Sequence, residues 1–317
     1  MKILVIGGAG YIGSHVTYEL CDNGYDVTVL DNLSTGFLEN IDKRANFIKG
    51  SFSKKNILAN ILKDVDAVIH LAALKAAGES MDNPINYSKH NIIDTINLIN
   101  CCLDNNVQNF IFSSSAAVYG IPNYLPVDES HPLNPINYYG FTKLFIEKQL
   151  LWYNQLKGLN IALLRYFNAA GIDMKERVFK KELNPQNLLP IVMEVAAGVR
   201  NRMNVFGNDY DTPDGTCLRD YIHVNDLAAG HVKALEMLSK NNKIITNLAT
   251  GKSHSVLDVI NKAQDITNVK INFSFSKRRD GDPSSLFAKS NNILNYKNKY
   301  SDLDNIISSM WNLYNPT

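Results

Sequence analysis

The sequence predicts an α/β protein built on a doubly wound parallel sheet, with a second, smaller mixed α/β domain. Short apolar runs alternate with helix-period segments through the first half of the 317 residues. A glycine-rich turn follows the first apolar run, and glycine, proline and polar residues become frequent beyond residue 168. Strands that alternate with helices imply right-handed βαβ units, and therefore a parallel sheet with helices on both faces.

Continuous apolar runs predict five buried strands, at residues 3–6, 27–30, 67–71, 110–113 and 161–165. Helical periodicity predicts helices at residues 11–23, 92–103, 138–153, 224–238 and 255–267. We expect residues 1–168 to form a Rossmann-type domain that binds a nucleotide. We expect residues 169–317 to form a substrate domain, with some segments returning to pack on the first.

Composition excludes several classes of partner. Lys and Arg number 32 against 31 Asp and Glu, so no basic field points to nucleic acid or to an anionic membrane. The seven histidines and four cysteines show no metal-ligand spacing, and we expect no metal site. No run approaches the roughly 20 apolar residues of a membrane span. We expect a soluble, cytoplasmic protein with reduced thiols.

The turn after the first strand carries a phosphate-binding pattern. Gly7, Gly10 and Gly13 satisfy G-x-x-G-x-x-G, and the same stretch also fits G-x-G-x-x-G. Such glycines permit a tight turn and let the backbone and a helix N-terminus approach a pyrophosphate. Asp31 follows roughly 20 residues later, at the end of the second strand, where a carboxylate can bind ribose hydroxyls. Because this carboxylate would repel a 2′-phosphate, the pattern predicts NAD as the cofactor.

A second pattern predicts the catalytic groups. Tyr139 and Lys143 form Y-x-x-x-K on a predicted helix, and the i,i+4 spacing places both side chains on one face. The motif alone is equally compatible with a surface tyrosine and a solvated lysine. Ser115 follows the fourth strand, at the edge of the sheet where ligands bind. This serine favours a catalytic triad.

The triad suits hydride chemistry at a carbon that bears a hydroxyl group. Tyr139 would remove the hydroxyl proton while hydride leaves for the nicotinamide, and Ser115 would hold the oxygen. Ionising a tyrosine near pH 7 requires its pKa to fall by roughly 3 units, or about 4 kcal/mol. One cation about 4 Å away supplies a similar energy at an effective dielectric constant of about 20. We expect Lys143 and the positive nicotinamide ring to supply it together.

With these motifs, the sequence resembles the UDP-galactose 4-epimerase family of extended short-chain dehydrogenases. The similarity covers essentially the whole chain, through residues 7–13, 31–33, 113–119, 139–143, 165–168, 206–210, 219–223 and 278–282. The resemblance implies that C4 of UDP-glucose or UDP-galactose is oxidised to a ketone and that the keto-sugar turns within the site. Hydride then returns to the opposite face, and NAD stays bound throughout.

The resemblance also implies roles for individual residues. It implies that Ser115, Tyr139 and Lys143 are catalytic. It implies NAD contacts from Gly7, Gly10, Tyr11, Ile12, Gly13, Asp31, Asn32, Ser51, Lys75, Asn91 and Tyr166. It implies UDP-sugar contacts from Asn168, Asn187, Leu188, Phe206, Arg219, Arg279, Asp282 and Leu286. A homodimer through the helices near 91–103 and 139–153 is also implied, although burial within one chain explains their apolar stripes equally well.

Three positions depart from the family pattern. Ser51 replaces the aspartate that binds the adenine amino group, and Leu71 replaces a phenylalanine. We therefore expect NAD to be held less tightly. Leu286 stands where members restricted to plain sugars have a tyrosine that fills the space of an N-acetyl group. The smaller residue predicts that UDP-GlcNAc and UDP-GalNAc are accepted as well.

Other functions on the same fold remain to be distinguished from epimerisation. Dehydratases that resemble this chain carry an Asp-Glu pair after the catalytic hydroxyl residue, where this chain has Ala116 and Ala117. Dehydration is therefore not expected. A UDP-uronate epimerase or decarboxylase remains an alternative. A non-catalytic NAD-binding protein is another, although such a protein would be free to lose the triad.

Overall fold

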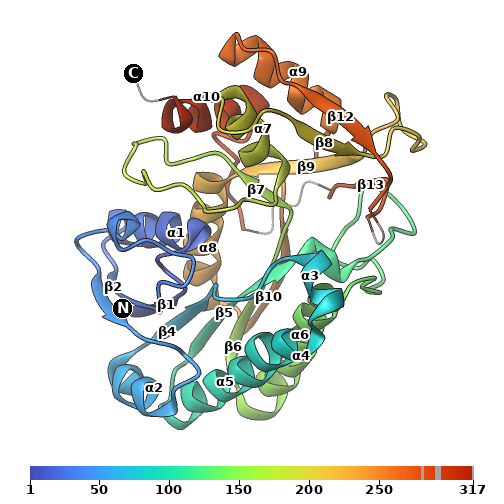
Figure 1. The fold of residues 1–317 in the computed structure, drawn as a ribbon. Helices are drawn as coiled ribbons and strands as arrows, with labels where there is room; N and C mark the ends of the chain where they lie inside the picture. The colour runs from blue at the N-terminus through green and yellow to red at the C-terminus, as the bar shows by residue number, and fades with distance from the viewer. Residues whose placement is uncertain (280–281, 290–293, 316–317) are drawn as a thin grey trace.

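A seven-stranded parallel sheet forms the larger part of the molecule (Figure 1). The computed structural model describes residues 1–279, 282–289 and 294–315. Neighbouring strands are parallel throughout, in the order β10-β6-β5-β4-β1-β2-β3. The strands are β1 (Lys2–Ile6), β2 (Asp26–Asp31), β3 (Asn46–Lys49), β4 (Ala67–His70), β5 (Asn109–Ser115), β6 (Asn160–Tyr166) and β10 (Lys243–Leu248). The predicted doubly wound parallel sheet is confirmed.

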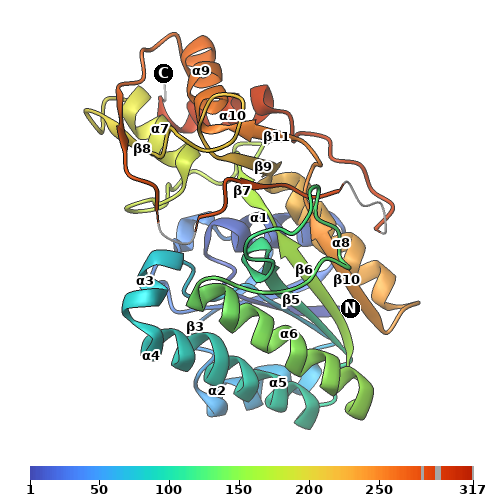
Figure 2. The ribbon, with the colours of Figure 1, turned by 90° about the vertical axis from the view of Figure 1, so that its right-hand side faces the viewer.

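Helices cover both faces of this sheet (Figure 2). One face packs against α1 (Tyr11–Asp22) and α8 (Val224–Leu238), and the other against α2 (Lys55–Ile61), α5 (Asp94–Asp104) and α6 (Tyr138–Lys157). Side chains of β1 alternate between the two faces: Ile3 and Val5 join the first core, whereas Leu4 and Ile6 join the second. This period of two is the side-chain geometry of a strand buried on both sides.

Short helical segments connect these layers. A continuous path of α3 (Ala77–Asp82), α4 (Pro84–Tyr87) and a π-helical stretch η3 (Ser88–Ile93) leads directly into α5. Single 3₁₀ turns are η1 (Leu38–Asn40), η2 (Leu62–Asp64) and η4 (Ala116–Val118). The helix predicted at 92–103 therefore begins with the π-helical residues of η3. Its regular α-helical part, α5, starts only at Asp94, whereas the helical path as a whole starts before residue 92.

A smaller lobe lies at the carboxyl edge of the sheet (Figure 1). Its four-stranded sheet contains β7 (Asn168–Ala170), β9 (Leu218–His223), β11 (Ser253–Ser255) and β13 (Ser285–Leu286), and its two-stranded sheet pairs β8 (Met203–Phe206) with β12 (Phe273–Ser276). Helices α7 (Leu188–Ala196), α9 (Val256–Thr267) and α10 (Leu303–Tyr314) complete it. These helices enclose a separate core that includes Val192, Ile260 and Ile307.

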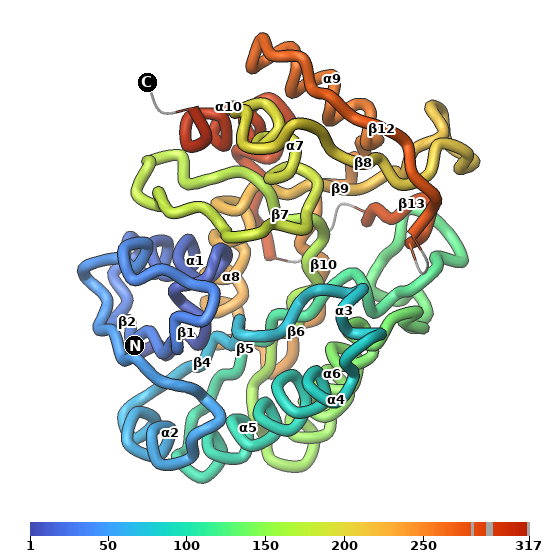
Figure 3. The backbone as a smooth tube through the Cα atoms, in the orientation of Figure 1, coloured from blue at the N-terminus to red at the C-terminus, as the bar shows by residue number. Residues whose placement is uncertain are grey.

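The second half of the chain contributes to both lobes. Strand β10 is the edge strand of the large sheet beside β6, and α8 packs on α1 across one face. The chain then re-enters the small lobe at β11 and α9. The backbone trace in Figure 3 shows this passage from the small lobe to the large sheet and back. Within the described ranges, no helix has both the length and the apolar character needed to cross a bilayer.

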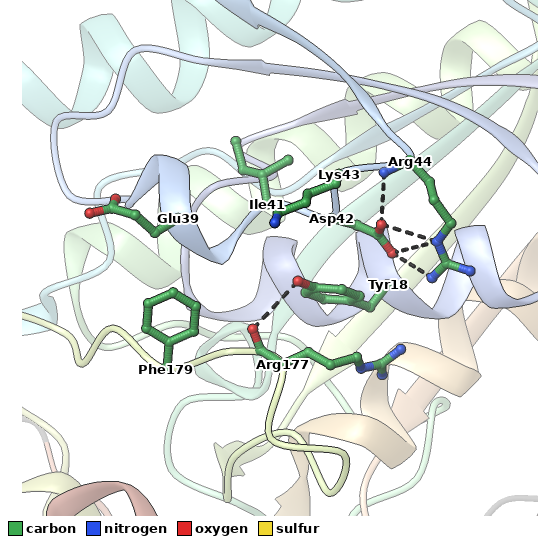
Figure 4. A pocket seen from close by; sticks show the side chains of 8 residues that line it. All are labelled: Tyr18, Glu39, Ile41, Asp42, Lys43, Arg44, Arg177 and Phe179. Atoms are coloured by element: carbon green, nitrogen blue, oxygen red, sulfur yellow. Dashed lines mark hydrogen bonds and ion pairs between the residues drawn. The ribbon is translucent and has the colours of Figure 1, made fainter.

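Ion pairs join the two lobes at one side of α1. Asp22 on this helix accepts hydrogen bonds from Arg44, Lys175 and Arg177 at 2.7–2.8 Å. Figure 4 shows the neighbouring pocket of about 510 Å³, where the Tyr18 hydroxyl donates to the Arg177 carbonyl at 3.4 Å. Single exposed pairs contribute about 0–1 kcal/mol each. Here one carboxylate shared among three cations fixes the long segment that follows β7.

Candidate active site

The turn between β1 and α1 has room only for glycine at its closest approaches. A Cβ atom on Gly13 would lie 2.0 Å from the carbonyl oxygen of Gly7, and Gly7 itself has a φ of +84°. At Gly10, which caps α1, the nearest obstacle would be that same carbonyl at 3.3 Å. The N-terminus of α1 is therefore open to a ligand, as a dinucleotide phosphate requires.

Asp31 ends β2 beside this turn. Its buried carboxylate accepts hydrogen bonds from the backbone of Ala9 at 3.0 Å and of Leu33 at 2.8 Å. Asn32 is exposed, and Ser51 lies just past β3, with its hydroxyl 2.8 Å from the hydroxyl of Ser53. The glycine cradle and an acid oriented at the same edge together fit NAD. No negatively charged group stands at residue 51 to meet an adenine amino group.

The three predicted catalytic residues lie together at the carboxyl end of β5. Ser115 is the last residue of the strand, and its hydroxyl is within hydrogen-bonding reach of Tyr139. Lys143 is buried, and its Nζ donates to the Ser113 carbonyl at 2.7 Å and lies 5.8 Å from the centre of the Tyr139 ring. The residues that the motif placed on one helical face are therefore brought against the end of the predicted strand.

Close packing at the start of α6 produces this arrangement. The Asn137 side chain caps the helix by accepting from the backbone of Gly140 at 2.8 Å. A Cβ atom on Gly140 would lie 2.5 Å from the carbonyl oxygen of Ala117. A larger residue would push the helix away from the turn after Ser115. The glycine thus allows Tyr139 to reach the serine.

Burial acts on both titrating groups of the triad. It raises the pKa of Tyr139 to about 12, although the hydrogen bond with Ser115 opposes this. It lowers the pKa of Lys143 to about 7, against the charge of Glu147. The sequence predicts that Lys143 and the positive nicotinamide ring together lower the pKa of Tyr139. Within the chain itself burial dominates, and the lowering by lysine and cofactor together stays a prediction.

Three further residues expected at NAD are engaged within the protein. Lys75 forms an ion pair with Glu182, from the segment between β7 and α7. Asn91, buried in η3, accepts from the backbone of Leu74 and donates to its carbonyl, both at 2.9 Å. Tyr166 is buried with its hydroxyl hydrogen-bonded to His231. Asn91 is therefore placed to orient the segment after β4 that carries Lys75.

The first helix also provides two of the expected cofactor residues. The hydroxyl of Tyr11 donates to the Gly171 carbonyl at 2.7 Å, and burial raises its pKa. Ile12 packs on the core beneath the sheet. Tyr11 therefore links the glycine turn to the small lobe.

The residues expected to hold the UDP-sugar gather in the small lobe. Arg219 on β9 pairs with Asp282 at 3.0 Å, and Arg279 lies 3.9 Å from the centre of the Phe206 ring. Leu286 on β13 is the register partner of Arg219. Asp280 and Gly281, which belong to the same sequence signature, lie outside the described residues.

The other substrate residues lie nearer the start of this lobe. Asn168 begins β7 and donates to the Asp220 carbonyl at 3.0 Å. Asn187 and Leu188 are the cap and first residue of α7. Leu286 packs on the cluster formed with Ala116, the residue after the catalytic serine. The substrate residues thus extend from the triad to the two arginines.

Sequence inspection did not single out Glu147, which is buried on α6 one turn beyond Lys143. Its carboxylate is paired with Arg165 on β6. The available signal was its spacing: residues 139, 143 and 147 recur every four positions and so share one helical face.

Comparisons with known proteins identify the family. The family model "NAD dependent epimerase/dehydratase family" matches residues 3–249. The chain is 41% identical over 317 residues to a UDP-glucose 4-epimerase of Lactobacillus helveticus, covering 98% of this chain and 96% of the relative.

Two solved structures share the fold over almost their whole length. The UDP-glucose 4-epimerase of Brucella ovis in complex with NAD superposes with a TM-score of 0.95 at 39% identity, covering 99% of this chain and 98% of the other. The UDP-Glc/GlcNAc 4-epimerase of Campylobacter jejuni gives 0.86 at 37% identity, with coverages of 99% and 98%. The chain belongs to the NAD-dependent epimerase/dehydratase family, within its group of UDP-glucose 4-epimerases.

Proposed function

We propose that this protein interconverts UDP-glucose and UDP-galactose by NAD-dependent epimerisation at C4, through a 4-keto intermediate. The placement of Ser115, Tyr139 and Lys143 at the end of β5 carries the proposal. This site lies between the glycine turn of the large lobe and the arginines of the small lobe. Family membership supports the same reaction.

The residues of the triad act on the hydroxyl at C4. Tyr139 accepts its proton and returns it after the sugar has turned, Ser115 holds the oxygen, and Lys143 stabilises the tyrosinate. When bound, NAD supplies the acceptor and donor for the hydride of C4. Arg219 and Arg279 bind the diphosphate, for which the guanidinium fork is suited.

The remaining assignments concern NAD. Asp31 and Asn32 bind the adenosine ribose, whereas Ser51 faces the adenine. Lys75 binds the nicotinamide half of NAD after it releases its partner Glu182. Asn91 acts indirectly, because it holds the backbone of Leu74, the residue before Lys75. The other proposed contacts are Gly7, Gly10, Tyr11, Ile12, Gly13 and Tyr166. We assign residues 1–168, with the returning α8 and β10, to the nucleotide-binding unit.

One assay tests the proposal. Purified protein with added NAD is incubated with UDP-galactose, and UDP-glucose is measured by chromatography. We expect conversion to the same equilibrium mixture from either direction. A parallel incubation with UDP-glucuronate tests the alternative function, a UDP-uronate epimerase or decarboxylase. Conversion of UDP-glucuronate without conversion of UDP-galactose contradicts the proposal.

The position of Leu286 favours a wider range of sugars. It packs against the cluster that contains Ala116, the residue after Ser115, and at this position a leucine leaves more room than a tyrosine ring. An unfilled pocket costs only about 1–3 kcal/mol of lost contact, whereas overlap is steeply repulsive. We therefore include UDP-GlcNAc and UDP-GalNAc among the substrates, and incubation with UDP-GalNAc tests this.

A homodimer is proposed through the helices near 91–103 and 139–153, which are η3–α5 and α6. These elements pack on one another and expose large apolar side chains, among them Ile93 on η3 and Phe141 and Trp152 on α6. Exposed apolar side chains that form one patch are typical of an interface. Sedimentation analysis of the wild type and of Trp152→Glu tests it, and a monomeric wild type contradicts it.

The four free cysteines fit a cytoplasmic location.

A further inference from the structure

The buried face of α6 carries an acid that the reaction described above does not use. The side chains of Glu147 and Arg165 are 2% and 3% exposed. Arg165 donates to the two carboxylate oxygens from Nε at 3.0 Å and from Nη2 at 2.7 Å. Ser114, the residue before the catalytic serine, also donates to this carboxylate. The acid is therefore held on both sides in one orientation.

The pair continues into a chain of hydrogen bonds behind the triad. Arg165 donates from Nη1 to the Tyr119 hydroxyl at 3.1 Å, and Tyr119 donates to Asn247 at 2.7 Å. Glu129 accepts from the backbone of Asn247 at 2.7 Å. This network joins α6, β5, η4, β6 and β10. It fixes the catalytic helix to both strands that flank the site.

Stability alone is a weak reason for such a pair. Withdrawing two charges from water costs several kcal/mol each, and a well-packed apolar pair of similar volume is often as stable. The location of the pair suggests another role, because Glu147 lies one helical turn beyond Lys143 and both are buried on α6. The hydrogen-bonding partners of Glu147 are the neutral Ser114 and the charged Arg165.

The groups that face Lys143 show what this carboxylate does. Burial lowers the pKa of the lysine to about 7, and Glu147 is the charge that raises it. From β4, His70 is kept neutral: burial and then the charge of Lys143 lower its pKa to about 3. On α6 itself burial raises the pKa of Tyr139, and the apolar ring of Phe112 on β5 lies 4.9 Å from the lysine Nζ.

We propose that Glu147 is a positioning residue for epimerisation, which fixes the catalytic turn of α6 against β5 and keeps the ammonium of Lys143 charged. The proposal rests on the proposed function, since the charged lysine matters because it stabilises the Tyr139 anion. Ser114 and Arg165 hold the carboxylate in the orientation that both effects need. Without its charge, the buried ammonium would release its proton at lower pH.

Glu147→Gln tests the charge while keeping the shape. The reaction needs charged Lys143, so kcat falls as pH rises through the pKa of this lysine. Removing the carboxylate lowers that pKa, and we expect the alkaline limb of kcat to move by about one unit to lower pH. Near pH 7.5 this corresponds to a loss of about tenfold in kcat. The KM for UDP-galactose should stay within about twofold of the wild type.

Two further proteins control for folding. Glu194→Gln removes an acid that pairs with Arg200 in the small lobe, and its pH profile should match the wild type. The double variant Glu147→Leu/Arg165→Met replaces the pair with apolar side chains and restores packing without charge. We expect it to melt no lower than Glu147→Gln and to retain the shifted limb. Recovery of the wild-type limb in the double variant would show a merely structural role and overturn the proposal.

A readout that does not use turnover separates this inference from the proposed function. Tyrosinate absorbance of the NAD-loaded protein is titrated, and subtraction of Tyr139→Phe isolates Tyr139. We expect Glu147→Gln to move this titration to higher pH, and an unchanged titration overturns the inference. If the wild type converts no UDP-hexose but Glu147→Gln still moves the Tyr139 titration, the proposed function is overturned and the charge effect of Glu147 stands.

Discussion

The two sides of the proposed site differ in how firmly the chain already holds their polar groups. On the cofactor side, Asp31, Asn91 and Lys143 are buried and hydrogen-bonded to backbone groups. On the substrate side, Asp282 and Arg279 are exposed. Asp282 pairs with Arg219, and Arg279 stacks on an aromatic ring.

This difference indicates how each half meets its ligand. Groups that are oriented before binding act on a transition state without further reorganisation. Apart from Lys75, which must exchange its partner Glu182, the cofactor half is preorganised in this sense. The arginines of the substrate half must exchange protein partners for phosphate oxygens, which lets the same lobe release product. We therefore expect changes in the first half to lower kcat and changes in the second half to raise KM.

The largest effect is expected for Tyr139→Phe. Losing the general base should lower kcat by about 10²–10⁴-fold, with nucleotide binding nearly unchanged. Steady-state kinetics with UDP-galactose measure it. Tyr138→Phe is the matched control, because the hydroxyl of the adjacent tyrosine bonds Ser88 instead, at 2.6 Å. Near-full turnover by Tyr139→Phe would remove the tyrosine from the mechanism.

A smaller effect, on KM instead of kcat, is expected for Arg219→Met. A hydrogen bond to a charged group contributes about 1.5–3 kcal/mol, so KM should rise by about 10- to 100-fold while kcat changes little. Arg278→Met is the control, since Arg278 is exposed and donates to Asp209 at 2.8 Å. Equal losses in both variants, or a fall in kcat alone for Arg219→Met, contradict the assigned role in binding.

The sequence predicted most of the large sheet but missed two of its strands. Strand β10 contains the polar residues Thr246 and Asn247, so its sequence does not show the continuous apolar run that predicts a buried strand. Both are nevertheless buried. Glu129 accepts from the backbone of Asn247 and from the Thr246 hydroxyl, and Tyr119 donates to the side-chain oxygen of Asn247. Strand β3 is an edge strand with only Phe47 and Ile48 between polar ends.

The site was predictable where chemistry requires a local motif. The glycine turn and Y-x-x-x-K each lie within a few residues, and the structure brings them to one edge of the sheet. The Glu147–Arg165 pair was not predictable in this way. A glutamate within a helix is usually solvated. The burial of Glu147 depends on Arg165, which lies 18 positions away on β6. Likewise, no local pattern shows that Glu182 meets Lys75, 107 positions away.

A selective effect is expected for Leu286→Tyr. The ring would occupy the space beside Ala116 that we assign to an N-acetyl group, so activity on UDP-GalNAc should fall by about 10- to 100-fold. Activity on UDP-galactose should change by less than about threefold. Leu286→Met, which keeps the volume, should leave the ratio of the two activities unchanged. Wild-type protein inert towards UDP-GalNAc, or equal slowing of both sugars by the tyrosine, contradicts the assignment.

The smallest effect is expected on the preorganised side itself, at the one position where a charge is missing. We assign Ser51 to the adenine end, and within the described residues its hydroxyl bonds Ser53. NAD should therefore leave the purified wild type measurably, and added NAD should raise its activity. In Ser51→Asp a carboxylate can accept from the adenine amino group. For a partly exposed bond of about 1 kcal/mol, NAD release should slow by about fivefold. Ser53→Asp places the same charge two residues away and should not slow release. Chromatographic measurement of the NAD that stays bound after gel filtration compares all three proteins. If the wild type keeps a full complement of NAD that the aspartate does not alter, the serine has no part in retention.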